Sequence, residues 1–317
     1  MIVQGEPLRR FADVILQGMG APPDVAAEVA THLVRANLSG HDAHGVCRLP
    51  EYAALAEAGE LRPAARPAIV RETAVAALFD ARHGFGQHAA AVALDWCLAR
   101  AHGAGVAVAA VRRSGDVGRL AEYAERAAEA GVLAIVTAGS AGPDAGETML
   151  HGGRTRFLGA NSWAFAAPGR RRWLAFEGST STVAAGEVLL ARAKGEPLPP
   201  DCLYDRFGRP STDPADLEEG GGLAGGDEEA AGIGGVFLEV VDPAAFGDTD
   251  AYQARVERTL VAAKSVRPVA GRSEVLLPGE PEARSRTDRG RTGVRLPETT
   301  WADLGALAAR FGVEVPA

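Results

Sequence analysis

Two side chains four positions apart, His44 and Arg48, are the best candidates for chemistry in this chain. An imidazole with a pKa of about 6.5 can donate and accept a proton near neutrality, which suits general acid–base catalysis. The planar guanidinium of Arg48 could bind a substrate carboxylate through two parallel hydrogen bonds. A carboxylate such as that of Glu177 could orient the imidazole. Together these residue types favour proton transfer at a small substrate.

Other interpretations of the same residues remain open at this point. A histidine beside a glycine in a loop is often a solvated surface residue, and Arg48 could form an ordinary salt bridge. His41 and His44 have the i, i+3 spacing of a metal-binding pair, but no third cluster of ligands is evident in the sequence. The remaining candidates have no arguable partner and are expected to be structural: His83, His88 and His151.

The bulk composition describes an ordinary globular protein. The chain has 317 residues, of which 47% are hydrophobic and 23% charged, so it can bury a large core without disulfides or metal. A net charge of −8 argues against a nucleic-acid partner. Three widely spaced cysteines and the absence of a leader or a long apolar run favour a cytoplasmic protein that does not enter a membrane.

Apolar periodicity alternates between helical and strand patterns. Two helices are expected within residues 7–37, the second with Asp24 as its N-cap and Gly40 as its stop. The low-complexity segment 218–235 has the composition of a flexible surface loop. Strands are expected near 68–80, 105–113, 132–139, 157–168, 171–178 and 235–242, and further helices near 87–103, 121–131, 183–195, 249–266 and 299–313. This order favours an α/β sheet.

A glycine-rich turn, Gly84-Phe85-Gly86-Gln87-His88-Ala89, follows a predicted strand and opens a predicted helix. The pattern matches the dinucleotide-binding fingerprint of a Rossmann domain. The second strand ends in Arg112 and Arg113 rather than in the acidic residue that would bind a ribose, but arginines there could suit a 2′-phosphate, so this feature does not decide between the interpretations. The alternative is a strand-to-helix turn whose glycines permit tight packing, and we favour this packing interpretation.

Several segments, in the same order along nearly the whole chain, resemble the malate/L-lactate dehydrogenase family. Residues 41–52 (HDAHGVCRLPEY) resemble its Asp-Ser-His-Gly signature with the following Arg-Leu-Pro and Tyr. Residues 158–168 (LGANSWAFAAP) resemble its Gly-Thr-Asn-Pro block, and residues 176–181 (FEGSTS) its Asp-Met-Ala-Thr-Ser block. Residues 83–87 and 278–284 resemble its Gly-x-Gly-Gln turn and a late cofactor-contacting segment.

The resemblance implies a non-Rossmann α/β protein that binds NAD or NADP and a small-molecule substrate, as a homodimer. We expect three parts: an N-terminal helical segment (1–72), a mixed-sheet core (73–248) and a C-terminal helical segment (249–317) that packs with the first. The resemblance assigns catalysis to His44, Glu177 and Asp116, and substrate binding to Arg48, Tyr52 and Asn161. It assigns cofactor binding to Ser179, Thr180, Ser181, Gly279, Glu280 and Pro281.

The chain also departs from the family pattern. Ala43 replaces a serine, Glu177 replaces an aspartate, and Asp116 stands where a second active-site histidine is usual. Glu187 stands near a position that usually carries lysine. The family's Gly-Gly-His-Lys-Gly-x-Gly block, which contacts the cofactor, is missing, and no lysine occurs between Lys194 and Lys264.

Two hypotheses follow. In the first, the protein transfers a hydride between NAD(P)H and a small 2-hydroxy or 2-keto acid or a cyclic imine, with His44 as the acid–base group. In the second, nicotinamide binding is lost, and the scaffold performs cofactor-independent acid–base chemistry or acts as a binding subunit. Cofactor binding distinguishes the two hypotheses.

Overall fold

The N-terminal helices form where apolar side chains recur at helical spacing. In the computed structural model, which describes residues 1–140, 146, 148–183, 185–224 and 235–316, α1 spans Gly5–Gly18 and α2 spans Pro23–Leu38. One face of α1 is buried: Leu8, Phe11, Ala12, Ile15 and Leu16. Two short 3-10 turns, Asp42–His44 and Val46–Arg48, then lead into α3, Leu49–Glu57. This agrees with the predicted loop and helix.

The predicted N-cap of α2 is wrong, and its predicted stop is confirmed. Pro22 precedes the helix and Pro23 is its first residue, because the fixed φ of proline suits the first helical turn. Asp24 lies inside that turn, and its carboxylate bonds Arg66 at 2.6 and 2.7 Å. Gly40 follows the helix at φ +91°, a conformation that favours glycine.

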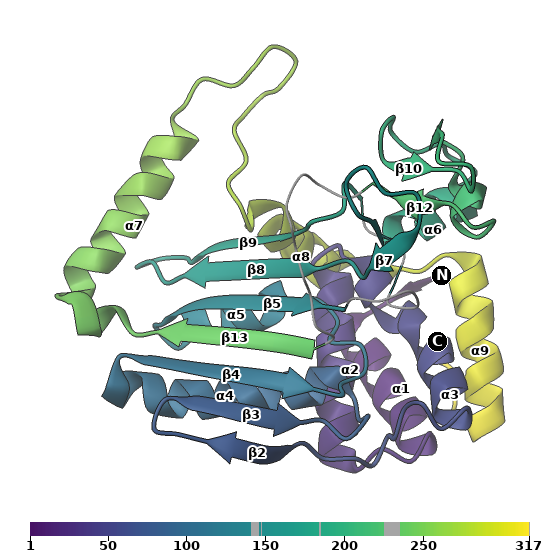
Figure 1. Ribbon diagram of the computed structural model, residues 1–317, viewed down its shortest axis with the longest axis horizontal. Coiled ribbons are helices and arrows are strands. Elements are labelled where there is room, and N and C mark those ends of the chain that lie inside the picture. The colour runs from purple at the N-terminus through teal and green to yellow at the C-terminus, as the bar shows by residue number, and fades with distance from the viewer. Residues whose placement is uncertain (141–145, 147, 184, 225–234, 317) are drawn as a thin grey trace. The chain divides into compact units, whose positions relative to one another are not determined.

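The two ends of the chain share one hydrophobic core. Strand β1 (Ile2–Val3) pairs antiparallel with β14 (Val294–Arg295). The C-terminal helix α9 (Glu298–Phe311) contributes Leu304 and Leu307 to the core that the buried face of α1 also enters, and Figure 1 shows α9 beside α3. The prediction of three parts with boundaries at 73 and 248 stays a prediction. By contact density the chain forms a large unit (Met1–Val136, Phe165–Phe176 and Leu238–Ala317) and a small unit (Thr137–Ala164 and Glu177–Phe237).

A seven-stranded mixed sheet has the strand order β2-β3-β4-β13-β5-β8-β9. Its strands are Ala68–Glu72 (β2), Ala76–Asp80 (β3), Val106–Arg112 (β4), Gly235–Val241 (β13), Leu133–Gly139 (β5), Ser162–Ala167 (β8) and Leu174–Ser179 (β9). β2 pairs antiparallel with β3, and β3 pairs parallel with β4. A strand from late in the sequence, β13, lies between β4 and β5. This is not the 3-2-1-4-5-6 order of a Rossmann domain, so the predicted non-Rossmann α/β class is confirmed.

Helices α4 (Gly86–Ala104) and α5 (Ala121–Glu129) cover one face of this sheet (Figure 1). Two further helices, α7 (Thr249–Lys264) and α8 (Glu280–Thr292), complete the large unit. The sequence did not indicate α8, because it is polar all round and has no buried residue that would mark an apolar face. No helix in the described part of the chain combines the length and apolarity that crossing a membrane requires.

The described part of the small unit contains a five-stranded sheet in the order β11-β10-β12-β6-β7, the α-helix α6 (Ala185–Lys194) and a short 3-10 helix, Pro214–Leu217. Its strands are Thr148–Met149 (β6), Arg156–Leu158 (β7), Leu203–Tyr204 (β10), Pro210–Ser211 (β11) and Gly222–Leu223 (β12). The predicted surface loop 218–235 is wrong at β12. Leu223 is buried there with Val188 and Leu203, because an apolar side chain gains by leaving water. Residues 225–234 of that prediction lie outside the described residues.

Candidate active site

The loop that carries His44 is held by Asn37, at the end of α2. The Asn37 amide donates to Asp42 Oδ1 at 2.7 Å, and its carbonyl oxygen accepts the backbone N–H of Val46 at 2.9 Å. A Cβ atom at position 45 would lie 2.3 Å from the same carbonyl oxygen, so only glycine fits there. His44 therefore sits in a loop whose backbone is fixed on both sides.

The polar helix α8 fixes the same loop from the opposite end of the chain. Arg289 binds the Asp42 carboxylate with both terminal nitrogens, at 2.7 and 3.1 Å. His41 Nε2 lies 3.2 Å from Glu282 Oε1. His41 thus forms a hydrogen-bond contact with α8. Among the described residues, no three His, Cys, Asp or Glu side chains are grouped to hold a metal ion. Helix α8 therefore holds the loop that carries His44.

Asp116 is the centre of a hydrogen-bonded group in the large unit. Tyr52 donates its hydroxyl to Asp116 Oδ2 at 2.6 Å, and Gln87 Nε2 donates to that hydroxyl oxygen at 2.7 Å. Arg48 Nε lies 3.5 Å from the same Oδ2, and the backbone N–H of Gly118 donates to Oδ1 at 3.1 Å. Two of the roughly four acceptor positions of this carboxylate therefore accept hydrogen bonds, and Arg48 adds an ion pair.

These contacts fix the protonation states in the group. Burial acts to raise the pKa of Asp116, but the charges of Arg48 and His44 outweigh it, and the pKa lies below its usual value. Burial and the Asp116 charge raise the pKa of Tyr52 well above its usual value. At neutral pH the pair is a carboxylate and a neutral phenol. The structure thus brings three predicted site residues, Arg48, Tyr52 and Asp116, into direct contact, and the charge of a fourth, His44, acts on the Asp116 carboxylate.

The guanidinium fork of Arg48 has an internal partner. Arg48 Nη2 donates to Glu51 Oε1 at 3.0 Å, and Arg48 Nη1 lies 2.9 Å from Glu51 Oε2. This is the parallel geometry with which a guanidinium binds a carboxylate. A substrate carboxylate bound at the predicted position would have to replace the exposed side chain of Glu51.

The glycine-rich turn at residues 84–89 contacts the loop between β4 and α5, which carries Asp116. A Cβ atom on Gly86 would lie 2.3 Å from Gly115 O and 2.5 Å from Asp116 O, so the two backbones touch directly. Gly115 N also donates to Gly84 O at 3.0 Å. The glycines therefore permit close packing of backbone on backbone, as the packing interpretation expects.

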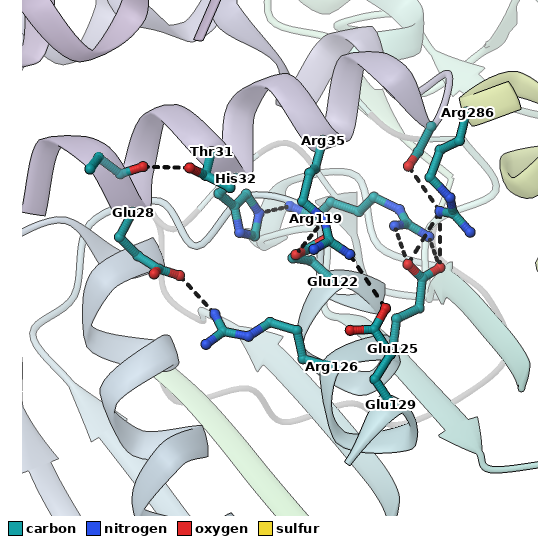
Figure 2. A network of polar contacts seen from close by, with 12 residues as sticks. Glu28, Thr31, His32, Arg35, Arg119, Glu122, Glu125, Arg126, Glu129 and Arg286 are labelled. Carbon is teal, nitrogen blue, oxygen red and sulfur yellow. Dashed lines mark hydrogen bonds and ion pairs between the residues drawn. The ribbon is translucent and has the colours of Figure 1, made fainter. Parts of the chain in front are cut away.

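A buried polar network contains Arg119, which follows Asp116 in the chain by three residues (Figure 2). His32, on α2, accepts the backbone N–H of Arg119 at 2.9 Å, and burial lowers its pKa to about 3, so it is neutral. The Arg119 guanidinium pairs with Glu125 at 2.9 and 3.3 Å, and both side chains are almost fully buried. Arg286 of α8 adds a second ion pair to Glu125 at 3.2 Å. The network thereby joins α2, α5 and α8.

Sequence reasoning missed this network. Arg119 and Glu125 resemble ordinary polar residues at the edge of a surface helix. The available signal was His32, which lies at helical spacing from the apolar residues Val25 and Val29 on the buried face of α2. A polar residue at such a position needs a buried hydrogen-bond partner.

The small unit contains five further predicted site residues: Asn161, Glu177, Ser179, Thr180 and Ser181. Asn161 adopts φ +43° and is 8% exposed, and no described residue bonds its amide nitrogen or oxygen. The buried Thr180 Oγ1 likewise has no hydrogen-bond partner among the described residues. Ser179 and Ser181 bond each other, Oγ to Oγ at 3.0 Å. The role of Glu177, which lies on β9, in orienting His44 stays a prediction.

The predicted cofactor segment at 279–281 forms the start of α8. Gly279 precedes the helix at φ +80°, and Pro281 lies in its first turn. The Glu280 carboxylate is bound by Lys264 Nζ and by Arg284, each at 2.7 Å. These cations and the Leu277 backbone N–H lower the pKa of Glu280 to about 2. Glu280 therefore serves an internal ion-pair cluster, and its cofactor contact stays a prediction.

Comparison with known proteins places the chain in a family. The family model for malate/L-lactate dehydrogenase matches residues 3–226 and 222–305. Hydroxycarboxylate dehydrogenase B of Escherichia coli O157:H7 is 30% identical over 97% of this chain and 94% of its own length.

Solved structures agree with the sequence comparison. The sulfolactate dehydrogenase of Methanocaldococcus jannaschii superposes with a TM-score of 0.88 at 25% identity, covering 99% of this chain and 98% of that one. The delta1-piperideine-2-carboxylate reductase of Pseudomonas syringae pvar. tomato gives a TM-score of 0.82 at 25% identity, covering 97% and 100%. The chain belongs to the malate/L-lactate dehydrogenase family, and its class is that of the oxidoreductases. The predicted family is confirmed.

Proposed function

We propose that the protein transfers a hydride between NAD(P)H and a small 2-hydroxy or 2-keto acid or a cyclic imine, with His44 as the acid–base group. The observation that carries the proposal is the fixed grouping of His44 with Arg48, Tyr52 and Asp116. Preorganised polar groups of this kind are what an acid–base site requires.

Each residue has a role in this proposal. A bound nicotinamide would supply the hydride and become oxidised. His44, as imidazolium, gives its proton to the carbonyl oxygen or imine nitrogen that gains the electron pair, and in the reverse direction it removes that proton. Tyr52 donates a hydrogen bond to the carboxylate of Asp116 and Arg48 forms an ion pair with it, and the charge of His44 acts on the same carboxylate.

The small unit offers groups that fit a nicotinamide cofactor. The amide of Asn161 and the hydroxyl of Thr180 are buried without described partners, and buried polar groups in native proteins are almost always hydrogen-bonded. Both could bind a ligand such as the carboxamide of nicotinamide. The start of α8 carries Glu280 and Glu282, whose negative charges oppose a phosphate there. We therefore expect weak binding of NADH and NADPH.

The charge of Asp116 bears on the substrate. Two like charges about 4 Å apart repel by roughly 1 kcal/mol in water and about 4 kcal/mol at an effective dielectric constant of 20. An anionic Asp116 disfavours a simple 2-keto acid whose carboxylate lies close to it. It favours a cationic or neutral hydrogen-bonding group, such as an imine, amine or amide. We expect negligible activity on pyruvate, oxaloacetate and malate.

Calorimetry with NADH and NADPH, followed by assays on those three acids, tests the proposal. Weak but saturable binding together with turnover of an imine or amino-containing substrate supports it. A dissociation constant in the low micromolar range with robust malate or lactate oxidation would show that neither Asp116 nor the missing block prevents cofactor binding and oxidation of 2-hydroxy acids.

The second hypothesis is favoured by one specific observation, the missing Gly-Gly-His-Lys-Gly-x-Gly block. If neither NADH nor NADPH binds at millimolar concentration, cofactor-independent chemistry or a binding role replaces the redox proposal. A homodimer and a cytoplasmic location are also part of our proposal. Both rest on the family resemblance and on the sequence, and light scattering at micromolar concentration tests the dimer.

A further inference from the structure

A small cavity lies against Asp116 in the large unit. Its volume is about 180 Å³, and it is lined by Tyr52, Leu55, Glu60, Leu61, Phe85, Gly115 and Asp116. Water occupies about 30 Å³ per molecule in the liquid, so the cavity has room for roughly six non-hydrogen atoms. A short side arm that ends in an ammonium group, such as n-butylammonium with its five non-hydrogen atoms, fits this volume.

The lining of this cavity combines apolar walls with two carboxylates. Leu55, Leu61 and Phe85 are apolar, and the edge of the Phe85 ring packs against Tyr52 with centroids 5.7 Å apart. Asp116 and Glu60 supply negative charge, and no lysine or arginine lines the cavity. Arg48 cannot neutralise this charge fully, because its fork is bound to Glu51 and only its Nε faces Asp116.

We propose that this cavity is a specificity pocket for a short aliphatic arm that ends in an ammonium group, with Asp116 as the residue that selects the charge. The apolar walls would bury the methylene groups, and each buried methylene contributes about 0.8 kcal/mol to transfer from water. Asp116 Oδ1 accepts one backbone bond from Gly118, which leaves one acceptor position for the ammonium. Only the assignment of this arm to a substrate rests on the proposed function; the binding of an ammonium group in the cavity does not.

Ligand-observed NMR titrations with n-butylammonium, n-butanol and butyrate test the pocket without cofactor or turnover. We expect n-butylammonium to saturate in the millimolar range and butyrate to bind at least tenfold more weakly. Asp116→Asn keeps the size of the side chain and removes its charge, so the preference for ammonium over butanol should fall about tenfold. Asp303→Asn, an exposed change on α9, is the matched control and should alter nothing.

A second variant separates the pocket from loss of folding. Leu55→Phe adds bulk at the cavity wall, and it should abolish binding of n-butylammonium while the unfolding midpoint stays near that of the parent protein. Equal binding of butyrate and n-butylammonium, or an unchanged ammonium preference in Asp116→Asn, overturns the proposal. Because none of these measurements uses NADH, failure of the redox function would leave their outcome unaffected.

Discussion

In the large unit, the loop that carries His44 (residues 41–48) and the Asp116 carboxylate have hydrogen-bond partners on several helices. Asp42 is bound by Asn37 and Arg289, and Asp116 is bound by Tyr52 and a backbone N–H. In the small unit, the amide of Asn161 has no partner among the described residues. The two regions carry predicted site residues of the same family pattern. The chain bonds the carboxylates of Asp42 and Asp116, but no described residue bonds the amide of Asn161 or the hydroxyl of Thr180.

Under the proposed function, this difference would separate groups that perform chemistry from groups that bind a ligand. A general acid must be held within a few tenths of an ångström of its working position, which internal bonds achieve before the substrate arrives. A cofactor-binding group gains affinity when its hydrogen bonds are left for the ligand, at a cost in stability. The predictions below test this division, beginning with the largest expected effect.

Replacing His44 should have the largest effect on activity. His44→Ala removes the proton donor, so turnover on the true substrate should fall about 10²–10⁴-fold, the usual range for general acid–base catalysis. Steady-state kinetics measures this, with His102→Ala as the matched control because His102 pairs with Asp242 outside the candidate site. Near-normal turnover of His44→Ala would remove His44 from the catalytic role.

Breaking the buried ion pair should have the largest effect on stability. Glu125→Ala removes the carboxylate that pairs with the buried Arg119 and with Arg286, so the free energy of unfolding should fall by about 3–5 kcal/mol. Urea denaturation measures the change. Glu298→Ala, an exposed change on α9, is the control, and its effect should be within about 0.5 kcal/mol. A loss below about 1 kcal/mol for Glu125→Ala would show that the network is not a structural anchor.

His32 should make stability depend on acid. Its pKa is about 3 in the folded protein, against about 6.5 when unfolded, so the unfolded chain binds the extra proton as the pH falls. This contribution is fully present above pH 6.5 and is lost progressively toward pH 3. From pH 7 to pH 4.5 the loss should be about 2.5 kcal/mol, because one unit of pKa corresponds to about 1.4 kcal/mol.

His32→Gln provides the comparison for this pH dependence, since an amide can accept the Arg119 N–H but does not titrate. The variant should be less stable than the parent at pH 7, and its stability should fall by about 2.5 kcal/mol less than that of the parent between pH 7 and pH 4.5. Parallel curves for the two proteins would mean that His32 is not the group responsible.

Arg48→Lys should have a moderate effect on substrate binding. Lysine keeps the charge but loses the planar fork, so KM should rise about tenfold if a substrate carboxylate binds there. Glu51→Gln should act in the opposite direction, because it removes the internal carboxylate that occupies the fork. If Arg48→Ala leaves both KM and kcat unchanged, the assignment of Arg48 to substrate binding is wrong.

Much of the fold could be predicted from sequence because the apolar period is strong. The buried face of α1 and the strands at β3, β4, β5 and β13 follow directly from it. Helix α8 could not be predicted, since it is held by arginine contacts to distant residues rather than by an apolar face. The two-residue strands of the small unit are too short to show a period.

For the candidate site, residue type alone led to His44 and Arg48, and their roles stay predictions. The pairing of Arg48 with Glu51 and of Tyr52 with Asp116 was not predictable, because single-residue chemistry does not specify which carboxylate meets which donor. The neutral state of His32 likewise depends on burial, which arises from the packing of α2 against distant parts of the chain.

The hydroxyl groups of the adjacent residues Thr180 and Ser181 provide the prediction with the smallest expected change in unfolding free energy. Thr180→Val replaces a buried hydroxyl that no described residue bonds with a methyl group of similar size, so the free energy of unfolding should stay unchanged or rise by up to about 1 kcal/mol. Ser181→Ala removes a hydroxyl that donates to Val183 O at 2.8 Å and should lower it by about 1 kcal/mol. If the small unit keeps Thr180 unbonded for a cofactor, Thr180→Val should also weaken NADH binding by several-fold, measured by calorimetry. A variant that is destabilised and binds NADH normally would show that Thr180 has a structural partner and does not await a ligand.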